Sequence, residues 1–302
     1  MRSASDGSQG EAIRPLIRPL ILIGTGRCGS TLVHRMLACH PRLAWLSQVS
    51  DRYPDRPKRT RLALRLLDLP GARSLLNTVL DPSEAYLFWE HYCPGFSSPF
   101  RDLTEADLRP HSREMLRNAL SSVVTRRRAR LLIKLTGWPR VGFLRSLFPD
   151  ALFVHVHRDG RAVASSFLNV RWWTGWSGPA NWKWGDLTPD QQERWERSGR
   201  SFVVLAGLEW ELLMSAHGKA LGGLAAEDYV EISYESLCAQ PVESVRRIIE
   251  FAGVEWTDSF AADMRRFSIH STSDKWMNHL SLTQRRQLEE AIRGSLAEYG
   301  YV

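Results

Sequence analysis

The sequence predicts an α/β fold in which a parallel sheet is flanked by helices, and three observations support this. Four apolar runs of strand length occur at about 20–24, 130–135, 151–157 and 229–233. The first run is wholly apolar, as is typical of a strand buried on both faces of a parallel sheet. Helical patterns separate the runs, which favours parallel strands joined by helical crossovers. Polar turns follow the first and third runs, at the strand ends where such sheets bind ligands.

The first strand leads into a glycine-rich loop and then a helix. The strand Leu20–Ile23 is followed by Gly24-Thr25-Gly26-Arg27-Cys28-Gly29, and Ser30-Thr31 open the helix. Such a turn directs backbone N–H groups at one point, where the helix N-terminus adds its positive dipole end, so the place suits a phosphate. The glycine spacing matches a nucleotide P-loop, but the cation stands inside the loop as Arg27.

Residues 45–125 show several helical patterns and few strand signals. We interpret them as a mostly helical insertion that covers the site. On a helix in this stretch, Glu84 and His91 are seven positions apart and share a face, whereas Glu90 lies one residue away from it. These three side chains are the candidates for a general base, in the order Glu84, His91, Glu90.

The third strand, 151–157, ends in a second site for an anion. Arg158-Asp159-Gly160 form the turn, and a helix is predicted from Arg161 to Leu168. Arg158 at the strand tip and Ser166 on this helix can converge on one phosphate, because a guanidinium offers a planar fork of donors and a serine a compact hydroxyl.

The rest of the chain supplies a tryptophan-rich segment and the closing helices. Five tryptophans stand among Gly and Pro between Arg171 and Trp184, which favours an ordered loop, and we expect 171–190 to form a lid. This loop either contacts a substrate or only packs on the core. Helices are expected from Val242 to Ala252 and at about 283–297, the last one opened by a Ser281-x-x-Gln284 capping box.

Taken together, these motifs resemble the bacterial-type sulfotransferases, which use 3′-phosphoadenosine 5′-phosphosulfate (PAPS). The segment Arg27-x-Gly29-Ser30-Thr31 is similar to the family's 5′-phosphosulfate loop, and Arg158 with Ser166 is similar to its 3′-phosphate motif. The resemblance implies the P-loop NTPase-like sulfotransferase fold with a helical insertion. It also implies donor contacts from Gly26, Arg27, Cys28, Gly29, Ser30, Thr31, Arg158 and Ser166.

Further segments extend the resemblance to about residues 19–302. Lys134 ends the second strand where the family carries a lysine, Tyr234 stands in the strand-end motif Tyr229–Leu237, and Lys275 lies in a late segment that closes over the nucleotide in many members. Three departures affect the site. The animal cytosolic enzymes have Trp after the two hydroxyl residues and His two residues after the lysine, where this chain has Leu32 and Thr136. Their late Arg-Lys-Gly cluster is also missing from this chain.

The resemblance implies transfer of a sulfuryl group from PAPS to a hydroxyl or amine, with adenosine 3′,5′-bisphosphate as the second product. Arg27 and Lys134 would offset the charge on the departing oxygen, and Glu84 or His91 would take the acceptor proton. Because these cations replace Mg²⁺, no metal is required. The acceptor is a small molecule, a carbohydrate or a glycolipid, and the tryptophans do not choose among them.

Composition sets the remaining expectations. The chain has 302 residues, with 40 Lys and Arg against 33 Asp and Glu, and fits one domain over 19–302 behind a disordered tail over 1–18. The net charge of +7 suits an anionic donor. No nucleic-acid motif, transmembrane span or signal sequence is present, so we expect a cytoplasmic enzyme; peripheral membrane contact and oligomeric state stay open.

The four cysteines form no Cys-x-x-Cys pair, and His34, Cys39 and His40 lack zinc spacing. Cys28 is either a thiol whose pKa the anion loop lowers or a small loop residue.

Two other classes of function were weighed. A P-loop kinase of a small metabolite would need ATP and Mg²⁺, and the chain lacks the usual lysine after the second glycine. A non-catalytic binder of polyanions or nucleic acid would show steep salt dependence without turnover.

Overall fold

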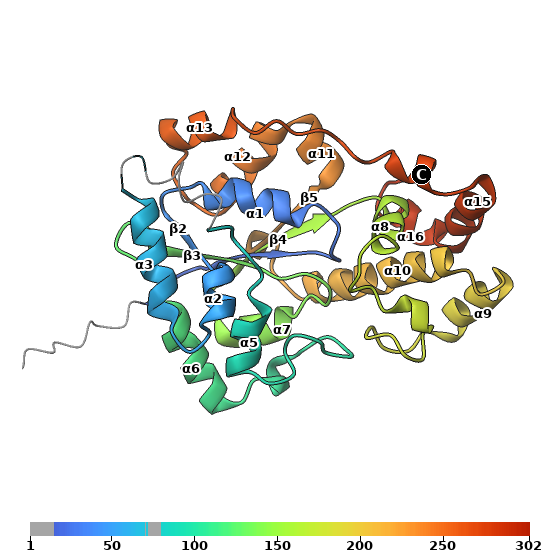
Figure 1. Cartoon of the computed structure of the whole chain (residues 1–302), viewed down its shortest axis with the longest axis horizontal. Helices are drawn as coiled ribbons and strands as arrows, with labels where there is room; N and C mark the ends of the chain where they lie inside the picture. The colour runs from blue at the N-terminus through green and yellow to red at the C-terminus, as the bar shows by residue number, and fades with distance from the viewer. Residues whose placement is uncertain (1–14, 70, 72–79) are drawn as a thin grey trace, which may run out of the picture.

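The computed structural model describes residues 15–69, 71 and 80–302. Its centre is a five-stranded sheet in the order β2-β3-β1-β4-β5, in which every neighbouring pair is parallel (Figure 1). The strands are β1 (Leu20–Ile23), β2 (Leu43–Trp45), β3 (Arg130–Lys134), β4 (Leu152–His157) and β5 (Tyr229–Ser233). The predicted parallel sheet is confirmed, and β2 is the strand that the sequence did not reveal, because three residues are too few to form a recognisable run.

Helices cover both faces of this sheet, and a further group of helices lies to one side of it (Figure 1). One face carries α1 (Ser30–Ala38), α11 (Tyr234–Ala239), α12 (Pro241–Phe251) and α13 (Asp258–Met264). The opposite side carries α2 (Gln48–Arg52), α3 (Pro57–Leu67), α5 (Tyr86–Tyr92), α6 (Pro110–Ser121) and α7 (Val141–Leu147). Beyond β4 and β5 lie α8 (Gly160–Phe167), α9 (Pro189–Arg197), α10 (Phe202–Leu221), α14 (Lys275–His279), α15 (Leu282–Ala291) and α16 (Arg293–Glu298). Short 3₁₀ turns occupy Glu105–Asp107, Gly175–Ser177 and Ala226–Asp228.

Two apolar clusters hold these elements together. The larger one surrounds the sheet, where Leu20–Ile23 is fully buried. The second joins α8, α10, α15 and the tryptophan-rich segment, with Trp210 at its centre. Each large apolar side chain removed from water in this way contributes about 1.5–3 kcal/mol. The clusters fix the carboxyl ends of β1, β3 and β4 relative to the segment 171–190.

The ends of the chain differ from expectation in detail. Residues 1–14 of the expected tail lie outside the described residues. Within the rest of it, Leu16 belongs to the core and the Arg18 N–H donates to Asp150. The expected helix over 283–297 is interrupted at Ile292, which separates α15 from α16. Its capping box is present, with Ser281 Oγ accepting from the N–H of Gln284.

The described parts of 45–125 contain α2, α3, α5, one 3₁₀ turn and α6, between β2 and β3. No helix in the described part of the chain combines the length and the apolar character that a membrane crossing requires.

Candidate active site

The loop after β1 has a backbone that only glycine tolerates well at its last position. Gly26, Arg27 and Gly29 all have left-handed φ angles, of 85°, 54° and 91°. A Cβ on Gly29 would also lie 2.4 Å from the ring of Tyr234. The loop therefore turns sharply over Tyr234 and delivers Ser30 to the first turn of α1, which is the arrangement that binds anions.

Lys134 connects this loop to the insertion. Its Nζ atom lies 2.9 Å from Thr31 Oγ1 and 2.9 Å from Glu84 Oε1. The Thr136 hydroxyl donates to the same Glu84 oxygen at 3.0 Å. Because Lys134 is only 6% exposed, its charge requires these partners. The structure thus brings together Thr31, Lys134 and Glu84 from three separate segments of the chain.

Arg158 leaves the end of β4 and is held from several sides. Its Nη2 donates to the carbonyl and hydroxyl of Thr272 at 2.8 and 3.0 Å, and its Nη1 donates to the Arg27 carbonyl at 3.3 Å. The guanidinium lies 4.1 Å from the ring centre of Tyr234, whose hydroxyl contacts Thr272 Oγ1 at 3.1 Å. Arg158 Nε is buried and has no hydrogen-bond partner among the described residues.

Ser166 joins the two sites for anions that the sequence predicts. Its Oγ accepts from Arg27 Nε at 2.8 Å, although the two residues are 139 positions apart. Arg27 is in turn contacted by Arg158 through its carbonyl. Arg27, Arg158 and Ser166 therefore form one cationic corner beside the loop.

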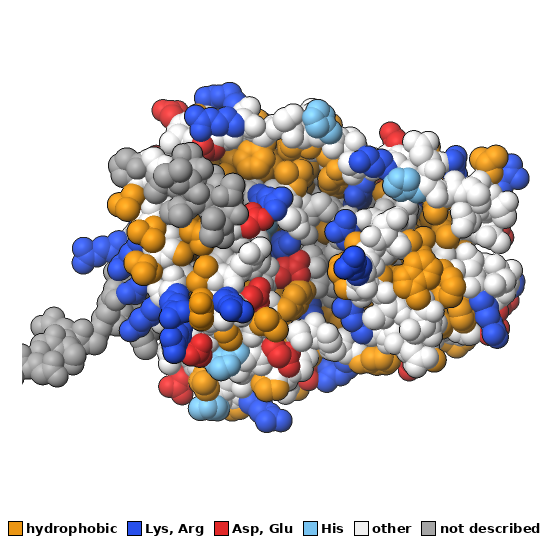
Figure 2. Space-filling model, in the orientation of Figure 1, with side chains coloured by type: hydrophobic (Ala, Val, Ile, Leu, Met, Phe, Trp, Pro, Cys, Tyr) orange, Lys and Arg blue, Asp and Glu red, His pale blue; other side chains and the backbone are white. Residues whose placement is uncertain are grey.

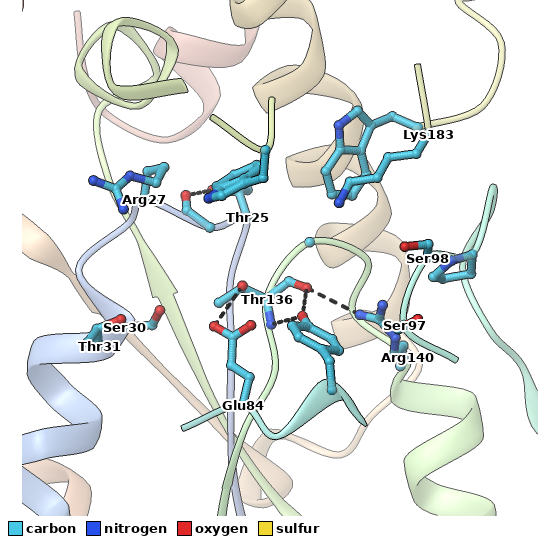
Figure 3. Close-up of a pocket in the computed structure, with 16 residues that line it drawn as sticks. Thr25, Arg27, Ser30, Thr31, Glu84, Ser97, Ser98, Thr136, Arg140 and Lys183 are labelled. Atoms are coloured by element: carbon cyan, nitrogen blue, oxygen red, sulfur yellow. Dashed lines mark hydrogen bonds between the residues drawn. The ribbon is translucent and has the colours of Figure 1, made fainter. Parts of the chain in front are cut away.

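A cavity of about 490 Å³ opens next to this corner (Figure 3). Its loop side is formed by residues 25–27, Ser30 and Thr31. Its tryptophan side is formed by residues 97–99, Arg140, Trp172, Lys183 and Trp184. Figure 3 shows Glu84 and Thr136 between the two sides. Figure 2 shows the same face of the molecule hollowed near its centre, with charged side chains of both signs along the hollow.

The comparisons with known proteins identify the family. The model of the sulfotransferase family matches residues 19–258, and this match covers most of the chain. The chain belongs to the sulfotransferase family. No curated protein matches the sequence closely.

Solved structures share the sulfotransferase fold. Sulfotransferase STF9 from Mycobacterium avium is 20% identical, with a TM-score of 0.57, over 94% of this chain and 77% of that one. Sulfotransferase STF1 from Mycobacterium tuberculosis is 17% identical, with a TM-score of 0.50, over 93% and 77%. Mouse sulfotransferase SULT7A1, solved with PAP, is 12% identical, with a TM-score of 0.46, over 94% and 86%.

Other residues expected in the site of this sulfotransferase lie elsewhere. The helix expected to carry both Glu84 and His91 begins only at Tyr86, because Ala85 takes a left-handed conformation, so helical spacing does not relate the two. His91 is exposed, packs edge-on against Tyr92 and does not line the cavity. Glu90 accepts from the N–H groups of Gly95 and Ser97 and shapes the loop after α5.

Cys28 and Lys275 take peripheral positions. The Cys28 side chain is buried, and burial raises the pKa of its thiol, which contradicts the alternative of an activated thiolate. Lys275 is the exposed first residue of α14 and lies outside the lining of the cavity.

The tryptophan-rich segment packs on the core and also borders the cavity. Trp173 and Trp182 are each 2% exposed and pack on the core, whereas Trp172 is 46% exposed. Trp172 and Trp184 also line the cavity. One face of the segment is therefore structural and the other faces the site.

Sequence reasoning missed four residues of the site. Tyr86 donates its hydroxyl to the Thr136 carbonyl at 2.8 Å, and Arg140, with a left-handed φ of 52°, donates to the carbonyls of Trp138 and Thr136. Lys183 stood within the tryptophan-rich segment, which was a signal in its favour. The sequence around Thr272 contains no signal that would predict its contact with Arg158.

Proposed function

We propose that this chain transfers the sulfuryl group of PAPS to a hydroxyl or amine of its acceptor and releases adenosine 3′,5′-bisphosphate. The observation that carries the proposal is the cationic corner, in which Arg27, Arg158 and Ser166 meet beside the glycine-rich loop. A donor with one phosphate on each side of its ribose needs two neighbouring anion sites. The loop with Ser30 and Thr31 would hold the 5′-phosphate, and Arg158 with Ser166 the 3′-phosphate.

The bond that breaks joins sulfur to the oxygen bridging it to the 5′-phosphate. As this bond lengthens, negative charge grows on the bridging oxygen, and cations placed in advance stabilise it. Lys134 Nζ is already 2.9 Å from Thr31 Oγ1, next to the place assigned to the 5′-phosphate. Arg27 supplies the second charge from within the loop. The acceptor oxygen or nitrogen forms the new bond to sulfur and loses its proton.

Glu84 is the base that the geometry favours for this proton. It faces the cavity between the two sides, whereas His91 does not line the cavity. Its Oε1 is held by Lys134 and Thr136, which fixes the orientation of the carboxylate. One ammonium group therefore contacts both the proposed base and the proposed donor site, so a shift of Lys134 toward the leaving oxygen would free the carboxylate to accept the proton.

The acceptor would occupy the tryptophan side, where aromatic faces and the hydroxyls of Ser97 and Ser98 are available. This lining suits a ring-bearing small molecule or the sugar of a carbohydrate or glycolipid.

Thermal stabilisation by ligands tests the proposal. Adenosine 3′,5′-bisphosphate at 100 times its Kd should stabilise the fold by about 2.7 kcal/mol, and ATP with Mg²⁺ should do so far less. Arg27→Ala should reduce both this shift and turnover with PAPS. Arg200→Ala is the matched control, because Arg200 has a similar left-handed φ of 59° but packs against Trp195 outside the cavity. Thermal stabilisation by ATP with Mg²⁺ but not by adenosine 3′,5′-bisphosphate would contradict the proposal and favour a kinase.

A further inference from the structure

Lys183 differs from the other cations around the cavity in having no hydrogen-bond or ion-pair partner within the described part of the chain. Arg27 is bound to Ser166 and Lys134 to Glu84. Arg140 donates to the carbonyls of Thr136, Trp138 and Phe96. Within the described part of the chain, no carboxylate lies within ion-pair distance of Lys183 Nζ, and no hydrogen bond holds it.

Two carboxyls act on Lys183 electrostatically, those of Glu209 and Glu84, and the effect of Glu209 is the larger. Glu84 is already paired with Lys134. Glu209 does not supply a full negative charge either. Glu209 is fully buried on α10 and accepts from Trp173 Nε1 at 2.6 Å. Burial raises the pKa of Glu209 to about 8, so at neutral pH the group is mostly protonated. No hydrogen-bond partner for Glu209 Oε1 is found in the part of the chain that the structure describes.

Two indole rings surround the Lys183 ammonium. Its Nζ lies 5.5 Å from the ring centre of Trp172 and 5.0 Å from that of Trp184. Both rings line the cavity, so the charge stands beside aromatic surface on which a flat ring could stack. Figure 3 shows Lys183 across the cavity from Arg27, Ser30 and Thr31, on the same side as Ser98.

A half-buried ammonium without a partner is stabilised when an anion is brought to it. We propose that Lys183 selects acceptors in which an aromatic or sugar ring carries an anionic group, a carboxylate or a sulfate. The ring lies against Trp172 and Trp184, the anion meets Lys183, and the reacting hydroxyl points toward Glu84. This inference rests on the proposed function and narrows its acceptor to acidic ring compounds.

Calorimetric binding to the enzyme saturated with adenosine 3′,5′-bisphosphate tests the selection. Two pairs of probes differ at a single group that is charged in only one member: 4-nitrophenyl β-D-glucuronide with the β-D-glucoside, and 4-hydroxyphenylacetate with its amide. The first pair reports on sugars and the second on aromatic rings. In at least one pair the anionic member should bind about 10-fold more tightly, as a charge-assisted hydrogen bond predicts.

Two variants separate charge from shape. Lys183→Met keeps the length of the side chain against the indoles and should reduce the preference to about twofold or less. Lys183→Arg retains the charge and should keep most of the preference. For probes that are turned over, the effect should fall on the acceptor KM and leave kcat nearly unchanged.

Several results would overturn the inference. Equal binding of both members of each pair would do so, as would failure of every anionic probe to bind. A preference for the anionic probe that survives in Lys183→Met would also contradict it. A loss of kcat with unchanged KM would instead assign Lys183 to the reacting sulfuryl group. If adenosine 3′,5′-bisphosphate itself does not bind, the proposed function fails and this inference fails with it. Binding of the bisphosphate without charge preference overturns the inference alone.

Discussion

The two sides of the cavity are built in different ways. The loop side consists of residues that directly follow β1, and its partners Lys134 and Arg158 stand at the carboxyl ends of β3 and β4. The tryptophan side is assembled from residues 97–99, Arg140 and 172–184, none of which belongs to a strand. Under the proposed function, donor recognition is tied to the sheet, whereas acceptor recognition depends on connecting segments that can vary without disturbing the sheet.

The cations on the two sides of the cavity also differ in their partners. On the loop side, Arg27 and Lys134 each have a polar partner at 2.8 to 2.9 Å. On the tryptophan side, Lys183 has aromatic neighbours and a buried carboxyl that burial keeps protonated. The cations of the loop side already have polar partners in the absence of a ligand. We infer that the Lys183 ammonium on the tryptophan side pairs with an anionic group of the ligand.

The largest expected effect concerns Glu84, which lies between the two sides. Glu84→Gln keeps an oxygen for Lys134 and Thr136 but removes the base, so kcat should fall by about 10²–10⁴ while affinity for adenosine 3′,5′-bisphosphate is retained. Steady-state kinetics and calorimetry measure the two quantities. Glu114→Gln, an exposed change on α6, is the control.

His91→Gln decides between the two candidate bases. We expect its kcat to stay close to that of the unaltered enzyme, because His91 does not line the cavity. If His91→Gln loses turnover and Glu84→Gln keeps it, His91 is the general base. The base would then have no contact with Lys134.

A second effect tests how far the tryptophan side depends on Glu209. The pKa of this carboxyl is raised by burial from 4.5 to about 8, so the folded state binds the proton more tightly than the unfolded state. Its stabilising contribution is complete below the unfolded pKa and is lost as pH rises toward the folded one, by at most about 1.4 kcal/mol per pH unit.

Glu209→Gln removes this dependence. The variant should therefore gain stability relative to the unaltered chain as pH rises from 5 to 8, a window that spans the two pKa values of Glu209, 4.5 and about 8. Denaturant unfolding at several pH values measures it, with the exposed Glu250→Gln as control. A parallel pH profile for Glu209→Gln and the unaltered chain would show that the carboxyl is ionised and neutralises Lys183.

A smaller effect tests the backbone of the loop side. Gly29→Ala places a Cβ against the Tyr234 ring in a left-handed conformation and should weaken binding of adenosine 3′,5′-bisphosphate by about 10-fold or more. Gly253→Ala has a φ of 64° but open space around its Cβ, so it separates backbone strain from the clash. Equal donor affinity in Gly29→Ala and Gly253→Ala would refute a tightly fixed loop.

The contrast between the sides explains what the sequence could predict. The loop after β1 and the pair Arg158 and Ser166 are short-range patterns, so their spacing was readable, and a parallel sheet brings such strand ends together. The contact between Arg27 and Ser166 depends on the order of β1 and β4, which the motifs alone do not specify.

Other features depend on contacts that sequence spacing does not encode. Glu84 lines the cavity, but it precedes α5 and reaches Lys134 from an irregular segment and not from the predicted helix. The role of Thr272 as a partner of Arg158 arises from packing of the segment before α14 over Tyr234. Lys183 could be noticed among the tryptophans, but only the three-dimensional structure shows that no described carboxylate forms an ion pair with it.

Binding of the donor's 3′-phosphate by Arg158 and Ser166 in the cationic corner can be measured in one calorimetric comparison. Adenosine 3′,5′-bisphosphate and adenosine 5′-monophosphate are titrated into the unaltered protein, Arg158→Ala and Arg246→Ala. Arg246 is the matched control, because it lies 4.6 Å from the ring centre of Trp256 much as Arg158 lies over Tyr234.

The account predicts that the unaltered protein and Arg246→Ala prefer the bisphosphate by about 10-fold or more, and that Arg158→Ala loses this preference while its affinity for the monophosphate changes little. Equal affinity of the unaltered protein for both nucleotides, or an equal loss of both in Arg158→Ala, would contradict it.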